Sequence, residues 1–118
     1  YADGYAEDLV WATQCHRSGF KFQYVHNAVV EHSHNYEIKS LFRKKFRHGI
    51  VYYRLKMLKP SVFRQFYYCF REVARDLIKS FQKLNITTIP YNIIYRITIH
   101  LAVYRGVKIA AIRKEAEL

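Results

Sequence analysis

The chain has 118 residues, of which 51% are hydrophobic and 17% are aromatic. This length predicts one domain or part of one, and this composition excludes a disordered tail. The chain carries 20 Lys and Arg residues against 9 Asp and Glu residues, a formal net charge of +11. Such a charge predicts an anionic partner, which could be a phosphate, a nucleic acid or an acidic membrane surface.

The sequence also indicates whether the chain spans a membrane, whether it is a fragment and in which redox compartment it lies. A transmembrane helix needs about 18 apolar residues without charges, and no such run is present. The chain begins at Tyr1 without an initiator Met or a signal peptide, so we expect it to be a piece of a longer protein. Two cysteines, Cys15 and Cys69, are too few for a disulfide scaffold and indicate a reducing compartment.

Residues 1–36 form the first of two zones and hold an acidic cluster, the single Trp and four of the six His. The segment Glu7–Arg17 predicts a helix, because two acidic residues precede an apolar run and suit the positive end of a helix dipole. Gly19 is the expected stop of this helix. The segment Phe20–His32 contains two short β-like runs, so we expect at most a small β element there.

Residues 37–118 form the second zone, which is basic, aromatic and helical in pattern. We expect helices over Glu37–Leu58 and Val62–Leu84, separated by Pro60, and a third helix over Tyr91–Arg113. Eleven apolar residues of the middle helix fall within an arc of about 160°: Val62, Phe63, Phe66, Tyr67, Phe70, Val73, Ala74, Leu77, Ile78, Phe81 and Leu84. Five basic residues lie outside that arc: Arg64, Arg71, Arg75, Lys79 and Lys83.

Two pairs of residues could carry chemistry. Glu7 and Asp8 either complement the helix dipole or provide a general base, and neighbouring helical positions diverge, so one of them can face a given site. His32 and His34 would face the same side of a strand, a geometry compatible with binding one metal ion. Two histidines without a third ligand do not make such a site, and solvated surface histidines are the alternative.

The order of these features is more informative than any one of them. Gly4 and Tyr5 precede a helix that opens with Glu7 and Asp8, an Arg-Ser-Gly turn follows at residues 17–19, and a β-like run leads to an Ala and then a His. This pattern resembles the C-terminal part of the catalytic domain of family-2 glycosyltransferases with the GT-A fold. The similarity is greatest to bacterial rhamnosyltransferase-like members that build surface polysaccharides, and it covers roughly residues 1–58.

The resemblance implies a role for each matching residue. Asp8 matches the general base that deprotonates the acceptor hydroxyl for inverting transfer, and Glu7 matches a companion acidic position that orients the acceptor or a cation. His32 matches a histidine that holds the divalent cation, Mg or Mn, or the diphosphate, and His34 is the fallback. The implied partners are a nucleotide-sugar donor and a polysaccharide or lipid-linked acceptor.

The resemblance also sets the expected fold and its limits. We expect an α+β but mainly helical fragment, in which residues 1–36 are the acceptor-side, C-terminal edge of a GT-A domain and residues 37–118 are a basic aromatic helical extension. The nucleotide-binding half with its Asp-x-Asp-type motif is absent from the sequence, so the isolated chain should be inactive. Unpaired strand edges in such a fragment would also allow it to form homo-oligomers.

The basic helices leave two readings open. They could bury their apolar sides in a core and expose their charges to solvent, or they could dock onto the anionic inner face of the cell membrane from the cytoplasm. The second reading gives the alternative function, a non-catalytic module that binds a membrane surface or a partner. Nucleic-acid binding is disfavoured, because no RNA-binding signature, zinc finger or helix-turn-helix spacing is present.

Overall fold

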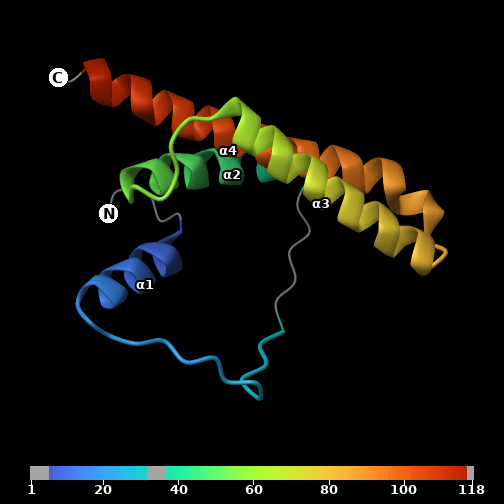
Figure 1. Cartoon of the computed structure of the whole chain (residues 1–118), viewed down its shortest axis with the longest axis horizontal. Helices are drawn as coiled ribbons and strands as arrows, with labels where there is room; N and C mark the ends of the chain where they lie inside the picture. The colour runs from blue at the N-terminus through green and yellow to red at the C-terminus, as the bar shows by residue number, and fades with distance from the viewer. Residues whose placement is uncertain (1–5, 32–36, 117–118) are drawn as a thin grey trace.

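A computed structural model of the chain describes residues 6–31 and 37–116 (Figure 1). These residues form four α-helices and one short 3₁₀ helix and contain no strand. The elements are α1 (Glu7–Arg17), α2 (Ile38–Arg54), α3 (Val62–Gln82), η1 (Ile86–Thr88) and α4 (Ile89–Ala116). The prediction of a mainly helical chain is therefore confirmed.

The helix predictions agree closely with the structure. α1 has the predicted bounds, and α2 and α3 begin and end within a few residues of theirs, with Pro60 in the break between them. α3 begins at a side-chain cap, since the Ser61 hydroxyl accepts a hydrogen bond from the Arg64 amide at 3.3 Å. α4 has 28 residues and extends beyond the predicted segment Tyr91–Arg113 at both ends. None of the described helices is both long enough and apolar enough to cross a membrane.

α1, α2 and α3 end in the same kind of turn. The residue after each C-cap has a positive φ, 88° at Gly19, 60° at Lys56 and 53° at Leu84. The next amide donates to a carbonyl in the last helical turn: Phe20 to Cys15 (3.0 Å), Met57 to Tyr52 (2.9 Å) and Asn85 to Ser80 (2.9 Å). These are Schellman turns, and the predicted stop at Gly19 is confirmed.

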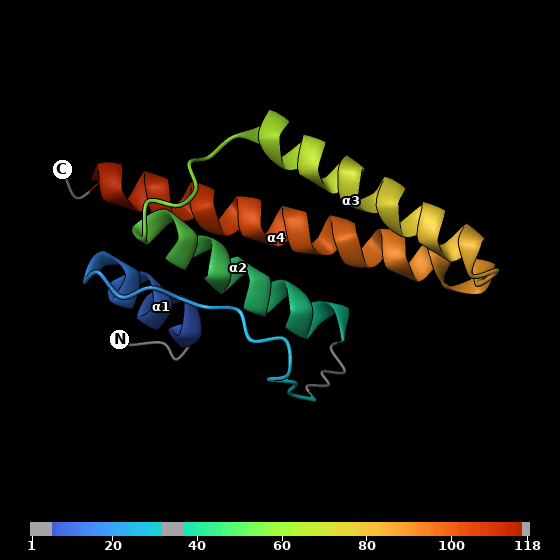
Figure 2. The same ribbon diagram turned by 60° about the horizontal axis from the view of Figure 1, so that its bottom comes forward.

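α4 is the central helix of the fold. Figure 2 shows α2 and α3 on opposite sides of it. α2 crosses α4 where Gly49 meets Gly106, and a Cβ on Gly106 would overlap the carbonyl oxygen of Phe46. The two helices approach this closely because neither glycine has a side chain. The small buried core is made of Leu41, Ala102, Val103, Val107 and Ala111.

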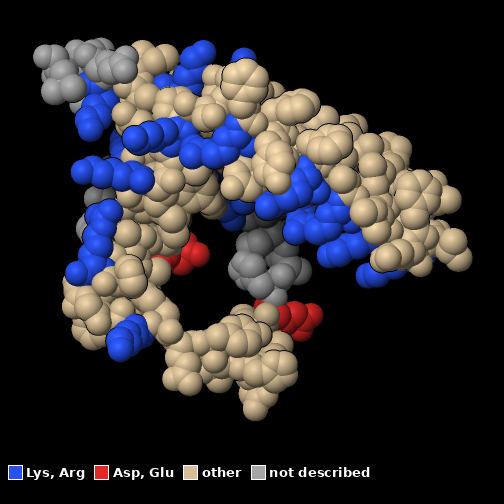
Figure 3. Space-filling view, viewed as in Figure 1, with Lys and Arg blue, Asp and Glu red and all other residues tan. Residues whose placement is uncertain are grey.

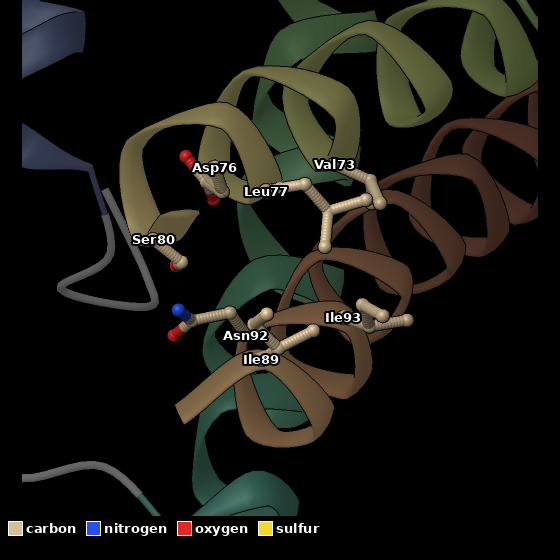
Figure 4. A pocket seen from close by; sticks show the side chains of 7 residues that line it. All are labelled: Val73, Asp76, Leu77, Ser80, Ile89, Asn92 and Ile93. Carbon is tan, nitrogen blue, oxygen red and sulfur yellow. The ribbon is translucent and has the colours of Figure 1, made fainter. Parts of the chain in front are cut away.

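α3 packs along the other side of α4 from its N-terminal end. Figure 4 shows the facing side chains near η1, with Val73 and Leu77 of α3 opposite Ile89 and Ile93 of α4. The space between these side chains does not hold a water molecule. This end of the α3–α4 contact is therefore closely packed.

No β element forms at residues 20–31, where the sequence predicted at most a small one. Residues 20–31 are exposed and irregular, with a turn in which the Ala28 amide donates to the Val25 carbonyl at 3.2 Å. Alternating apolar and polar residues form a strand only when a neighbouring strand supplies hydrogen-bond partners. The described residues supply no such neighbour, and His32 lies outside them.

Candidate functional site

The acidic pair lies in the first turn of α1. Glu7 and Asp8 are both exposed, and Ala6 precedes them in a left-handed conformation with φ 58°. No side chain caps this end of the helix, so the two carboxylates are the groups that complement its positive partial charge. Their predicted position at the start of a helix is confirmed, and their exposure leaves them accessible to a ligand.

Asp8 acts electrostatically on two residues of α2. The pKa of His48 is lowered, first by burial and then by the positive charges of Lys45 and Lys44, while the Asp8 carboxylate opposes this shift. The pKa of Tyr52 is raised, mainly by burial and further by Asp8. The rings of His48 and Tyr52 are in edge contact, with their centroids 6.1 Å apart. The Asp8 carboxylate therefore acts on an imidazole whose pKa is lowered and on a phenol whose pKa is raised.

Sequence reasoning did not identify His48 or Tyr52 as neighbours of Asp8. The available signal was their i, i+4 spacing, which places both on one side of α2. A direct contact also connects the two helices, since Arg17 at the end of α1 donates from Nη2 to the Leu55 carbonyl at 3.2 Å.

The predicted metal ligands are not brought together by the described residues. His32 and His34 lie outside the described ranges, and their predicted role is not tested. Within residues 6–31 and 37–116, no three His, Cys, Asp or Glu side chains converge. The Mg or Mn ion that the resemblance implies therefore stays a prediction for the complete enzyme.

The segment after α1 exposes large apolar side chains. Phe20, Phe22, Tyr24, Val29 and Val30 are all exposed, and Tyr24 is 86% accessible. Phe22 makes one ring contact with Trp11 of α1, with centroids 6.2 Å apart in an edge arrangement. Figure 3 shows open space between this segment and the helices α2 to α4. The segment that follows α1 thus presents an apolar surface.

The polar side of α3 faces α4 and is held there by a charged network. Arg96 of α4 donates from Nη1 to Glu72 at 3.0 Å and from Nε to Asp76 at 2.6 Å. The buried His100 ring lies 3.1 Å from Glu72 through Nε2 and 2.9 Å from the Gln65 amide through Nδ1. With that amide donating to Nδ1, the Nε2–H of His100 donates to Glu72. Both acidic residues of α3 are therefore paired against α4.

Most of the apolar side of α3 consequently points outward, whereas Val73 and Leu77 are half-buried against α4. Phe63 is 89% exposed, Phe66 72% and Phe70 67%, and Tyr67, Ile78 and Phe81 are also exposed. Burial of this arc in a core, one of the two readings that the sequence left open, is wrong for most of its length. Of the five basic candidates, Arg71, Arg75, Lys79 and Lys83 are exposed, whereas Arg64 is partly buried and donates to the Lys59 carbonyl. Figure 3 shows a band of Lys and Arg along one edge of α3.

Comparison of the chain with protein-family models, with curated proteins and with solved structures found no match.

Proposed function

We propose that this chain is part of a glycosyltransferase, which moves a hexosyl or rhamnosyl unit from a nucleotide-sugar donor to a polysaccharide or lipid-linked acceptor with inversion. The observation that carries the proposal is the exposed Asp8 carboxylate in the first turn of α1, whose charge acts on the His48 imidazole of α2. The ordered motif from Gly4 to His32 in the sequence supports it further.

In the proposed reaction, Asp8 accepts the proton of the acceptor hydroxyl as its oxygen attacks the anomeric carbon. A new carbon–oxygen bond forms while the bond from that carbon to the nucleotide diphosphate breaks, and the diphosphate leaves with the electron pair. A carboxylate on the acceptor side also stabilises the positive charge that develops on the sugar ring. Glu7 orients the acceptor. The exposed apolar segment from Phe20 to Val30 is the surface on which the donor-binding part of the complete enzyme would pack.

The test is sugar transfer by the complete enzyme that contains this chain. Asp8→Asn keeps the size of the side chain but removes the base, so turnover should fall about 10²- to 10⁴-fold while the nucleotide-sugar still binds. Glu31→Gln is the matched control, since Glu31 is an exposed carboxylate in the irregular segment, and it should keep its turnover. Full turnover in Asp8→Asn would refute the general-base assignment.

We also propose a second candidate function, favoured by the outward apolar side of α3. In this function, α3 docks onto the anionic inner face of the cell membrane, and the chain is a peripheral module on the cytoplasmic side. The aromatic side chains would enter the interface between headgroups and acyl chains. The exposed basic residues Arg71, Arg75, Lys79 and Lys83 would each add about 1 kcal/mol of attraction to anionic lipids.

Vesicle sedimentation tests the second function. The chain should pellet with vesicles that contain anionic lipid, less so at high salt, and not with neutral vesicles. The double variant Phe63→Ser/Phe70→Ser should lose most of this binding, whereas Tyr24→Ser, at an equally exposed aromatic residue outside α3, should keep it. Equal loss in both variants would show that binding does not use α3. Salt-sensitive retention of single-stranded RNA without a lipid preference would favour a nucleic-acid role instead.

A further inference from the structure

A basic cavity lies between the end of α2, the loop that follows it and the last turns of α4. Its volume is about 910 Å³. Five of its lining side chains are basic: Arg54, Lys56, Lys59, Arg113 and Lys114. The other lining residues are apolar or aromatic, among them Ile50, Leu58 and Ile109, and none is acidic. We propose that this cavity binds an anionic amphiphile, in which a phosphate group carries an apolar chain. The proposal goes beyond the functions given above and uses neither Asp8 nor the outward side of α3.

The positive charge of the side chains that line the cavity exceeds the negative partial charge of the helix ends beside it. Arg54 lies in the last turn of α2 and Arg113 and Lys114 lie in the last turn of α4, where basic residues complement the helix dipole. Two helix ends together carry a partial charge of about −1, whereas the five basic side chains carry +5. No hydrogen bond from Lys56 or Lys59 side chains to a described residue offsets this excess. A bound phosphate would neutralise it through charge-assisted hydrogen bonds.

The backbone of Lys56 adopts an unfavourable left-handed conformation. Its φ of 60° is the left-handed conformation at which glycine is the usual residue, and a lysine there costs about 1–2 kcal/mol. A glycine would make the same turn more easily but would remove one cation from the cavity wall.

The wall of the cavity is held in place from two sides. Arg17 of α1 donates to the Leu55 carbonyl, and Arg64 of α3 donates to the Lys59 carbonyl. The backbone of the loop between α2 and α3 is thus held at both ends before a ligand arrives. Such preorganisation lowers the entropic cost of binding.

The shape and lining of the cavity define the rest of the ligand. A volume of about 910 Å³ lies in the range of small-molecule sites and is far larger than a phosphate ion needs. The space not filled by the phosphate is bounded by Ile50, Leu58 and Ile109, which favour an apolar chain over further charged groups. This is the reason for proposing an amphiphile and not a free phosphate or a nucleotide.

Calorimetric titration of the chain at low salt tests the proposal with three probes. Monomeric dihexanoylphosphatidic acid carries both features, dihexanoylglycerol lacks the phosphate, and inorganic phosphate lacks the chains. The first probe should bind more tightly than the other two. Equal affinity for dihexanoylglycerol would overturn the role of the basic residues, and equal affinity for inorganic phosphate would overturn the role of the apolar wall.

Variants distinguish the cavity from general attraction to a basic protein. Lys56→Gly keeps the left-handed turn and should weaken binding of the phosphatidic acid about 5- to 10-fold. The double variant Lys59→Gln/Arg113→Gln provides an independent test and should weaken it further. Lys39→Gln, at an exposed lysine near the start of α2, removes the same charge outside the cavity and should leave binding unchanged. Circular dichroism confirms that each variant folds. Equal affinities in all four proteins would overturn the proposal.

Discussion

Arg96 of α4 binds Asp76 of α3 through two hydrogen bonds, one from Nε to Oδ2 at 2.6 Å and one from Nη2 to Oδ1 at 3.3 Å. This fork-to-fork geometry is the strongest arrangement of an arginine and a carboxylate. Because Arg96 also binds Glu72, one guanidinium connects two turns of α3 to α4. The contact fixes which side of α3 faces the rest of the protein.

The stability of the chain should depend on acid through Asp76. The hydrogen bond from Arg96 holds the pKa of Asp76 below its ordinary value, against the opposing effect of burial. The resulting stabilisation is present above the unfolded-state pKa of about 3.9 and is lost as pH falls through the folded-state pKa. Asp76→Asn should lower the free energy of unfolding at pH 7 by about 1–2 kcal/mol and flatten its decline in acid. Urea unfolding at pH 7 and pH 3 measures both effects.

Leu84→Gly should stabilise the protein. Leu84 is 86% exposed, so removal of its side chain loses little buried apolar surface. Its φ of 53° means that its backbone is strained. Glycine relieves that strain but loses more entropy on folding, which leaves a net gain of about 0.5–1 kcal/mol. Gly19→Ala, in the equivalent turn of α1, should act in the opposite direction. Thermal unfolding of the two variants measures the difference, and a destabilised Leu84→Gly would contradict the assigned turn.

Gly106→Ala should separate α2 from α4. The new Cβ would overlap the carbonyl oxygen of Phe46, which is backbone and cannot rotate away. The helices would have to move apart, at a cost of about 1–3 kcal/mol. Arg105→Ala changes the exposed neighbouring position and should have little effect. Chemical denaturation of both variants tests the close approach, and equal stability would show that the two helices do not meet at this glycine.

The titration of His48 should report the position of α1. Burial and the charges of Lys45 and Lys44 lower the pKa of His48, whereas Asp8 raises it. Asp8→Asn should therefore lower this pKa further, and Lys45→Gln should raise it. Proton NMR of the imidazole ring follows both changes. An unaltered titration in Asp8→Asn would mean that the carboxylate does not lie beside α2.

Sequence periodicity predicted where the helices lie but not how α3 is oriented. The spacing of the apolar residues in the sequence placed eleven of them on one side of this helix. Burial of that side in a core was one of the two readings. In the structure, Arg96 and His100 of α4 instead bind the acidic residues on the opposite side of α3. A pattern taken from one helix contains no information about the charges on its partner, so this orientation could not be predicted from α3 alone.

Local turn chemistry was predictable in one of three cases. Gly19 signals a left-handed turn because glycine adopts it at little cost. Lys56 and Leu84 adopt the same conformation without any signal in the sequence, because helix-end hydrogen bonds impose it on residues that do not favour it. The sequence therefore contained no indication that Lys56 turns toward the cavity that it lines. The cavity was also missed because Lys59 and Arg113 are far apart in sequence and meet only through the packing of α2 on α4.

The arrangement around α4 has a consequence for how the molecule comes apart. Within the described residues, α2 and α3 each pack against α4, and no contact joins them to each other. Loss of α4 would therefore remove both attachments at once, whereas detachment of α3 would leave the α2–α4 pair with its glycine crossing intact. We therefore expect α3 to detach first during unfolding, while α2 and α4 remain packed against each other.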